Sequence, residues 1–308
     1  MNKRPHIPVL LNEVIQSLNI KKGGIYVDGT FGAGGYTEAI LNAAPDVRVI
    51  AIDQDKTAID SGQELVKKYA PQLTLIHGRF GDMESIVSEQ VDGVVLDIGV
   101  SSMQIDRPER GFSFQKDGPL DMRMGQTGQT AADVVNTFDE KQLADIIYQY
   151  GEERFSRKIA KAIVEARKIK PFETTMELTN CIHKVITYKP GDIDTATRTF
   201  QALRIFVNDE LGELERGLKG AEKILKDGGI LSVVTFHSLE DRIVKNFLQN
   251  TTAPIQHVNK YKETTERQNT PFKLAFKKPI SATKEEISQN PRSRSAHLRS
   301  AIRQRKVK

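Results

Sequence analysis

The stretch Ile25-Tyr-Val-Asp-Gly-Thr-Phe-Gly-Ala-Gly-Gly-Tyr36 places a short apolar run, an aspartate and four glycines directly before a helical pattern that extends to Ala44. This order predicts a strand, a tight glycine loop and a helix. Glycines let a backbone approach a ligand closely, and the first turn of a helix presents unpaired N–H groups. We therefore interpret residues 28–36 as a ligand-binding loop, with a plain strand-to-helix turn as the alternative.

The glycine spacing narrows the kind of ligand. Gly29 is followed by glycines three, five and six residues later, which is not the spacing of dinucleotide-binding loops, and no Gly-Lys-Ser/Thr of a nucleoside-triphosphate loop is present. An aspartate at the start of the loop, Asp28, suits a ligand with a cationic or hydroxylated part. S-adenosylmethionine has both.

Composition describes a globular chain without a membrane partner. The 308 residues are 38% hydrophobic, and no apolar run approaches the length of a membrane span. The first nine residues are basic but lack the apolar centre of a secretory signal, so we expect a cytoplasmic protein. The single cysteine, Cys181, excludes a disulfide framework and a cysteine-rich zinc site, and we expect no metal ion.

Positive charge is concentrated at the C-terminal end. Residues 251–308 hold 14 Lys or Arg and 4 Asp or Glu, a net charge of +10, whereas the whole chain has a net charge of +5. A basic terminal segment is typical of a protein with a polyanionic partner, although a solvated tail is equally compatible.

Strand and helix patterns alternate in the first hundred residues. Apolar strand segments are expected at 25–28, 47–53, 73–77 and 93–98, with helices at 57–68 and 83–89, and a fifth strand follows at 230–236. Such alternation predicts an α/β fold with a Rossmann-like, mostly parallel sheet. Ligands of these sheets bind at the carboxyl ends of the strands, and Asp28, Asp53, His77 and Asp97 all fall there. Asp53 suits the hydroxyls of a ribose, with a helix N-cap as the alternative.

A long segment interrupts the alternation. Residues 106–194 show turns and helical patterns but no clear strand. We expect a discontinuous α/β core at 1–105 and 200–308, with a helical insert at 106–199. Within the insert, one helix face is expected to be apolar and formed by Phe155, Ile159, Ala162, Ile163 and Ala166. The opposite face carries Arg154, Arg157, Lys161 and Lys168 within an arc of about 60°. This basic face fits phosphate contacts or simple solvation.

The core resumes after the insert. Apolar spacing from 203 to 225 predicts one long helix, and the strand at 230–236 ends at His237 and Ser238. Beyond residue 252 the only expected element is an antiparallel edge strand at 272–276. No Gly-x-Ser-x-Gly elbow exists, and adjacent His237 and Ser238 are an awkward nucleophile and base, so a serine hydrolase is a poor fit.

Ten short segments carry a family resemblance. They resemble the bacterial MraW/RsmH methyltransferases, and the likeness extends over residues 6–300. The segments are His6-Ile-Pro-Val9, Asp28–Gly35, Ala51-Ile-Asp53, Leu96–Gln104, Pro108–Ser113, Asp117–Met124, Tyr150-Gly-Glu-Glu153, Thr199–Asn208, Phe236–Arg242 and Asn290–Ser295.

The resemblance implies a class I S-adenosylmethionine-dependent methyltransferase that methylates N4 of a cytosine in the decoding centre of small-subunit ribosomal RNA. It implies that Gly34, Gly35 and Tyr36 lie against the methionine part of the cofactor, Asp53 binds the ribose and Phe80 flanks the adenine. Asp97 and Gln104 would complete the cofactor site. Tyr36 departs from the family, which usually has histidine there.

The chemistry of the residues agrees with this expectation. Cytosine N4 attacks well only when an acceptor holds its N–H groups and the methyl group lies in line, and Asp97 is the candidate catalytic group. Methylation at C5 requires a cysteine thiolate, whereas Cys181 lies in the insert and is expected to be a packed helix residue. We expect the basic insert face, His237 and Ser238 to contact RNA.

The expected partner is small-subunit ribosomal RNA or an assembled small subunit, with the insert and the basic tail providing RNA contacts. The sequence leaves a monomer or a homodimer open. A methyltransferase acting on a protein or small molecule and a catalytically idle RNA-binding assembly factor remain alternatives.

Overall fold

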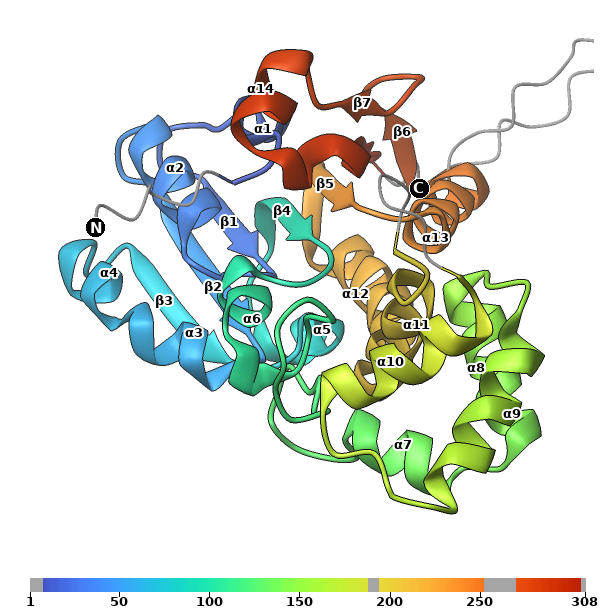
Figure 1. Ribbon diagram of the computed structural model, residues 1–308. Helices are drawn as coiled ribbons and strands as arrows, with labels where there is room; N and C mark the ends of the chain where they lie inside the picture. The colour runs from blue at the N-terminus through green and yellow to red at the C-terminus, as the bar shows by residue number, and fades with distance from the viewer. Residues whose placement is uncertain (1–7, 188–193, 252–269, 306–308) are drawn as a thin grey trace, which may run out of the picture. The chain divides into compact units, whose positions relative to one another are not determined.

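The computed structural model describes residues 8–187, 194–251 and 270–305, which form two compact units (Figure 1). The first unit comprises Met1–Gly99 and Leu211–Lys308, and the second comprises Val100–Glu210. The helical insert expected at 106–199 falls within the second unit. None of the described helices is both long and apolar enough to cross a membrane.

The first unit contains an eight-stranded sheet among its described residues, with strand order β3-β2-β1-β4-β5-β8-β6 and β7 paired with β8. Strands β1 to β5 are parallel to their neighbours, and β6, β7 and β8 pair antiparallel. The predicted mostly parallel α/β fold is therefore confirmed. The strands are β1 Ile25–Asp28, β2 Arg48–Asp53, β3 Leu73–His77, β4 Val91–Asp97, β5 Leu225–Thr235, β6 Phe272–Leu274, β7 Ile280–Ser281 and β8 His297–Arg303.

The strand order reverses between β1 and β4, which is where open α/β sheets bind ligands. In register, Asp53 lies opposite His77 at the ends of β2 and β3, and Asp97 lies opposite Val234. Asp28 ends β1 beside Ala51. The four polar residues predicted for the carboxyl ends of the strands thus share one edge of the sheet.

Helices cover both faces of the sheet because its strands are apolar on both sides. Helices α1 (Leu11–Leu18) and α2 (Gly35–Ala43) contact one another and pack on the face that carries Tyr26, where Gly93 leaves room for that ring and for Leu18. On the other face, α5 (Met83–Ile86), α12 (Glu210–Ile224) and α13 (Ser238–Thr251) form a buried cluster with alternate residues of β1 and β4. The sheet is thus an inner layer between two helical layers.

Two predicted helices are each divided into two. The helix expected at 57–68 consists of α3 (Lys56–Ser61) and α4 (Gln63–Lys68), separated by Gly62, where a Cβ would meet Leu75 and Phe31 at 2.6 Å. The helix expected at 203–225 is interrupted at Asp209, whose φ of 51° is left-handed and ends α11 (Thr197–Asn208). The prediction of one long helix there is wrong, and β5 begins at Leu225 rather than at residue 230.

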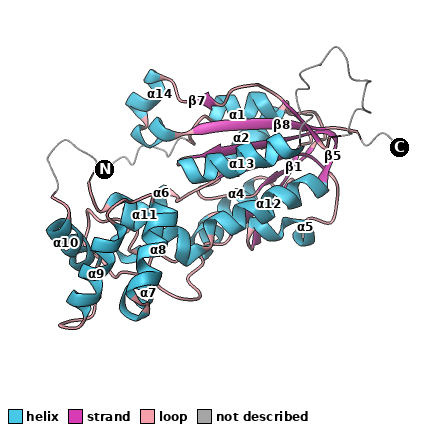
Figure 2. Cartoon of the chain, turned by 90° about the vertical axis from the view of Figure 1, so that its right-hand side faces the viewer, coloured by secondary structure: helices cyan, strands magenta, loops and turns pink. Residues whose placement is uncertain are grey.

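The C-terminal region contributes more to the sheet than its composition suggests. The antiparallel edge strand expected at 272–276 is confirmed as β6. The basic segment 292–305, expected as a tail, is not one, because β8 lies between β5 and β6 in the sheet. Figure 2 shows β8 as a strand of the sheet. Its Arg299 donates two hydrogen bonds to Asp241, at 2.7 and 2.9 Å, and Arg303 is 7% exposed. The expected tail residues 252–269 lie outside the described residues, as do 306–308 and the motif residues His6 and Ile7.

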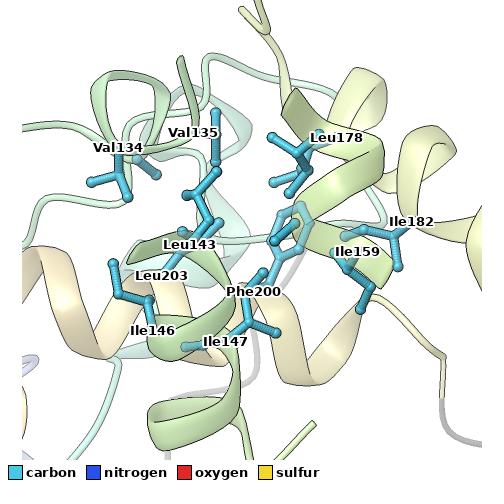
Figure 3. Packing of buried hydrophobic residues seen from close by; sticks show 14 of the residues in the cluster. Val134, Val135, Leu143, Ile146, Ile147, Ile159, Leu178, Ile182, Phe200 and Leu203 are labelled. Atoms are coloured by element: carbon cyan, nitrogen blue, oxygen red, sulfur yellow. The ribbon is translucent and has the colours of Figure 1, made fainter. Parts of the chain in front are cut away.

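The second unit is helical in its described part, and its only strand-like pairing there is an isolated bridge between Pro119 and Thr174. Side chains from five of its helices, α7 to α11, form a separate apolar core that includes Phe200 and Leu203 (Figure 3). Phe155, expected on the apolar face of α9, is instead 42% exposed and lies outside this core. The helices are α6 Ser102–Asp106, α7 Ala131–Thr137, α8 Glu140–Gly151, α9 Ser156–Arg167, α10 Thr175–Val185 and α11.

Short elements complete the chain. Three 3₁₀ turns occur in the described residues, η1 Phe80–Asp82, η2 Pro108–Arg110 and η3 Pro291–Ser295, together with helix α14 Lys284–Gln289. The first of them follows β3 at the carboxyl edge of the sheet and carries Phe80.

Candidate active site

The glycine loop is tied to the end of β2 by its own backbone. The Phe31 N–H donates to the Ile52 carbonyl at 3.0 Å, and the Gly32 N–H donates to Asp53 Oδ2 at 2.7 Å. Gly34 has a φ of +80°, and a Cβ there would meet the Phe31 ring at 2.9 Å, so this position requires glycine. A Cβ on Gly35 would lie 2.2 Å from Pro8. The loop is therefore built by close packing around Phe31 and Pro8.

Asp28 stabilises the loop. Its carboxylate is fully buried and accepts hydrogen bonds from the Thr30 N–H at 3.1 Å and the Thr37 hydroxyl at 2.7 Å. Burial raises the pKa of Asp28 to about 6, and these hydrogen bonds limit the rise. Both its oxygens thus serve the loop, and a contact of this aspartate with the cationic part of a ligand stays a prediction.

Tyr36 anchors the segment before α1. Its ring is 4% exposed, and its hydroxyl donates to the Val9 carbonyl. Burial, aided by the charge of Asp97, raises the pKa of Tyr36 well above its ordinary value, so the hydroxyl stays protonated and remains a donor. The predicted contact with the methionine part of a cofactor would therefore use the backbone of Tyr36, at the first turn of α2, which Gly34 precedes without a capping side chain.

Asp53 retains acceptor capacity at the end of β2. Oδ1 accepts from the Asp55 N–H at 2.8 Å, and Oδ2 accepts from the Gly32 N–H. Each carboxylate oxygen has a further lone pair, so two hydroxyls can be bound in addition. The helix N-cap that was the alternative for Asp53 is provided by Asp55, which accepts from the Thr57 N–H at 2.9 Å. Burial raises the pKa of Asp53, with the two backbone donors opposing the rise.

Phe80 lies in the turn after β3, next to the glycine loop. A Cβ on Gly29 would come within 3.1 Å of the Phe80 Cβ, and a Cβ on Gly217 of α12 would meet the Phe80 ring at 2.4 Å. The ring thus packs directly on the helix backbone. His77, two residues before the turn, is exposed, and its Nε2 lies 3.1 Å from the Gln54 carbonyl.

Asp97 has an unsatisfied oxygen at the end of β4. Its backbone N–H donates to the Thr30 hydroxyl at 2.7 Å, whereas its buried Oδ1 has no hydrogen-bond partner among the described residues. Burial raises the pKa of Asp97 well above its ordinary value, and the nearby charges of Asp28 and Glu240 add to the rise. A buried polar atom without a partner is costly, and a perturbed carboxyl at the switch point is a functional-site candidate.

His237 belongs to the turn between β5 and α13. Its Nε2 lies 3.0 Å from Oε1 of the fully buried Glu240. The other Glu240 oxygen accepts from the backbone N–H groups of Phe236 and His237, at 2.8 and 3.2 Å. The imidazole is therefore held in place by the turn, and Ser238 begins α13 beside it.

Comparison with known proteins identifies the family of this chain. Residues 3–304 match the model of the MraW methylase family. The chain belongs to the MraW methylase family. It is 56% identical to ribosomal RNA small subunit methyltransferase H of Paramagnetospirillum magneticum, over 98% of this chain and 97% of that protein. It is also 58% identical to the protein of the same name from Parvibaculum lavamentivorans, over 97% of this chain and 89% of that one.

Solved structures show a more distant likeness. An rRNA methylase from Streptococcus thermophilus has a TM-score of 0.44 and 11% sequence identity, covering 99% of each chain.

The expected site residues of this MraW family member fall in both units. The first unit brings together Gly34, Gly35, Tyr36, Asp53, Phe80, Asp97, His237 and Ser238 at the carboxyl edge of its sheet. Gln104 belongs to the second unit, where its side-chain oxygen accepts from the Ser101 N–H at 3.1 Å and completes a capping box on α6. The basic residues predicted for α9 also belong to the second unit.

The four basic residues predicted for one helix face differ in their surroundings. Arg157 and Lys161 lie on α9, whereas Arg154 precedes the helix and Lys168 follows its last residue. Arg154, Arg157 and Lys161 are exposed and form no ion pair within the described part of the chain. Lys168 pairs with Glu165 at 2.8 Å. Exposed Phe155 adjoins the unpaired residues, and the Lys158 ammonium lies 5.6 Å from its ring centroid.

Sequence reasoning missed the polar residues that hold this site together. Thr30, Thr37 and Glu240 were not singled out, because a hydroxyl or carboxylate in a turn gives no sign of its partner. Glu213 was also missed, although one signal for it exists. It lies on α12 with Gly217 and Gly220 at spacings of four and seven, a small-residue helix face that begins with an acid.

Proposed function

We propose that this chain transfers a methyl group from S-adenosylmethionine to N4 of a cytosine in small-subunit ribosomal RNA. The observation that carries the proposal is the family match over residues 3–304, with near full-length relatives named as ribosomal RNA small subunit methyltransferases. The site in the first unit has the chemistry that this reaction requires. Action on ribosomal RNA places the protein in the cytoplasm of a bacterial cell.

The residues at the carboxyl edge of the sheet fit the cofactor. Asp53 has lone pairs for two ribose hydroxyls, and the Phe80 ring offers an apolar flank for adenine. The first turn of α2 offers N–H groups to the methionine carboxylate. Asp97 Oδ1 is a buried acceptor without a partner in the described structure, suited to a cationic or N–H donor group.

The cofactor, when bound, supplies an electrophilic methyl group on sulfonium, and the C–S bond breaks as the N4–C bond forms. The protein aligns the two atoms and accepts a proton. Asp97 holds an N–H of the amine, which localises the nitrogen lone pair, and its raised pKa makes it a better base for the proton that N4 releases. No protein nucleophile is required.

RNA binding is assigned to the second unit. Arg154, Arg157 and Lys161 are exposed cations without ion pairs in the described residues, and Phe155 presents an open ring beside them. Lys and Arg neutralise phosphates, and exposed aromatic rings stack on unpaired bases. Free ribosomal RNA or an assembled small subunit is the expected substrate.

Methyl transfer from radiolabelled S-adenosylmethionine tests the proposal. Purified small subunits, free small-subunit RNA and ribosomal protein are each incubated with the enzyme, and the RNA is digested and analysed by mass spectrometry. We expect label in RNA as N4-methylcytidine. Label in protein alone indicates a protein methyltransferase, and RNA binding without any transfer indicates a non-catalytic assembly factor.

A further inference from the structure

Helix α12 presents a face made of one acid and two glycines to the segment that carries Phe80. Glu213, Gly217 and Gly220 lie at spacings of four and three, so they share one side of the helix. A Cβ on Gly217 would meet the Phe80 ring at 2.4 Å, and one on Gly220 would meet Met83 at 2.8 Å. The segment 79–84 therefore lies directly on the helix backbone.

Glycine is among the least favourable residues in a helix interior, so two of them on one face indicate a packing requirement. Here the packing requirement is that Phe80 and Met83 lie close to the backbone of α12. Any side chain at position 217 would displace the Phe80 ring from its place beside the glycine loop. The helix thus sets the position of a turn that is distant in sequence.

Glu213 fixes the same segment by hydrogen bonds. It is 2% exposed, and its Oε1 accepts from the Gly81 N–H at 2.7 Å. Its Oε2 accepts from Arg79 Nε at 2.8 Å and from the Arg216 guanidinium at 3.0 Å. The donors at 79 and 81 stand on either side of Phe80. A buried carboxylate with three donors holds a turn more rigidly than an apolar contact does.

We propose that Glu213 is a positioning residue for the adenine end of the cofactor site, acting through the turn that carries Phe80. This inference rests on the proposed function, which places adenine against Phe80. Neither Glu213 nor Gly217 needs to touch the cofactor. Their effect is to keep one ring in the orientation that the base requires, and such placement governs affinity more than total contact does.

Glu213→Gln tests the role with little change of shape. The amide retains one acceptor oxygen, but its NH₂ group faces donors and cannot hold both Gly81 and Arg79. We expect the Kd for S-adenosylhomocysteine and for adenosine, measured by calorimetry, to rise by the same factor, ~10-fold. The KM for S-adenosylmethionine should rise likewise, with kcat at saturating cofactor unchanged. A merely structural role would lower kcat and thermal stability without this split.

The matched control is Glu215→Gln, which removes an exposed carboxylate two residues away on the same helix and should leave both Kd values at those of the parent. Gly217→Ala is a second, independent test, because alanine favours the helix while its Cβ must displace the Phe80 ring. If Glu213→Gln fails to fold, the Kd values of the Gly217→Ala variant alone test the role.

The outcomes are distinct. Weaker binding of both adenosine-containing ligands in each of the two variants that folds, Glu213→Gln and Gly217→Ala, supports the role. Parent affinity in a folded Glu213→Gln protein, or in Gly217→Ala, overturns it. If the parent protein itself binds no S-adenosylhomocysteine, the proposed function fails, and the role falls with it for that separate reason.

Discussion

Three aspartates at the ends of neighbouring strands have three different environments, and environment determines what each can do. Asp28 is enclosed by the glycine loop and stabilises it. Asp53 accepts one backbone hydrogen bond on each oxygen and has lone pairs left for a ligand. Asp97 has a buried oxygen without a partner in the described residues. Identical side chains are therefore suited to be a structural group, a candidate binding group and a candidate base.

Replacing Asp53 should weaken cofactor binding. Two hydrogen bonds from ribose hydroxyls to a carboxylate contribute roughly 1.5–3 kcal/mol each. Asp53→Ala should therefore raise the Kd for S-adenosylhomocysteine at least ~10-fold by calorimetry. The control is Asp60→Ala, which removes an exposed carboxylate on α3. An unchanged Kd in a folded Asp53→Ala protein would remove this residue from the site.

Asp28 should make the stability of the first unit depend on pH. Its pKa is raised in the folded protein, so the folded state binds the proton more tightly than the unfolded state. Its favourable contribution is complete below the unfolded pKa of 3.8 and is lost as pH rises through about 6. Asp28→Asn lacks this titration.

The variant should consequently gain stability relative to the parent by about 1–2 kcal/mol between about pH 5 and about pH 7.5. Urea unfolding of both proteins at the two pH values measures this change. If the free energy of unfolding changed by the same amount with pH in both proteins, burial would not raise the pKa of Asp28.

Basic residues on α9 and on β8 look alike in composition but differ in their partners. Arg157 and Lys161 on α9, and Arg154 just before it, are exposed, whereas Arg299 on β8 is bound bidentately to Asp241. Partnered charges contribute to the fold whether or not RNA is bound. Unpartnered charges are available to phosphates.

Removing the three unpaired cations of α9 should reduce the salt dependence of RNA binding. The slope of log Kd against log salt falls by about 0.7–0.9 for each phosphate that the protein no longer neutralises. We expect the triple alanine variant of Arg154, Arg157 and Lys161 to have a slope smaller by about 2–3 units and to keep its affinity for S-adenosylhomocysteine. Lys68→Ala with Lys223→Ala is the control, because both lysines are ion-paired and belong to the first unit. A triple variant with the parent's slope would make this face a solvated one.

Arg299→Ala should affect stability rather than RNA binding. It leaves Asp241 without two charge-assisted hydrogen bonds, which should lower the free energy of unfolding by about 2–3 kcal/mol. Arg305→Ala, which alters an exposed residue just after β8, should leave the free energy of unfolding unchanged within error. Chemical unfolding compares the two variants. Weaker RNA binding by folded Arg299→Ala protein would contradict the structural assignment of β8.

Prediction from sequence succeeded where periodicity and spacing carry the information. The parallel strands, the glycine loop and the shared edge of Asp53 and Asp97 follow from local pattern. β8 did not, because its arginines give it the composition of a solvated tail, and the strands that it pairs with, β5 and β6, are not shown by local pattern. Phe155 was placed on an apolar face by helical spacing, but it begins its helix and extends beyond the core. Pairings across the sequence, such as that of Glu213 with Gly81, leave no local pattern.

The single cysteine and the candidate catalytic aspartate belong to different units of the chain. Cys181 packs on α10 in the apolar core of the second unit, and burial raises the pKa of its thiol. A protonated, enclosed thiol cannot add to a pyrimidine ring. The candidate acceptor Asp97 belongs to the first unit.

Cys181→Ser should therefore keep nearly full methyl transfer, whereas Asp97→Ala should lose it. Mass spectrometry of the modified RNA should identify N4-methylcytidine in both the parent and the Cys181→Ser reaction. A C5-methylated product, or activity abolished by Cys181→Ser in a folded protein, would overturn the mechanism.

The position of β8 has a consequence for how the protein is made. The ribosome synthesises residues 297–303 after every other strand of the sheet, yet this strand pairs on both sides, with β5 and with β6. During synthesis β5 has an open edge that awaits its neighbour, while the contiguous helices of the second unit can already be folding. A nascent chain that stalls before residue 297 thus lacks an interior strand of the described sheet. Such a fragment is a natural target for quality-control proteases.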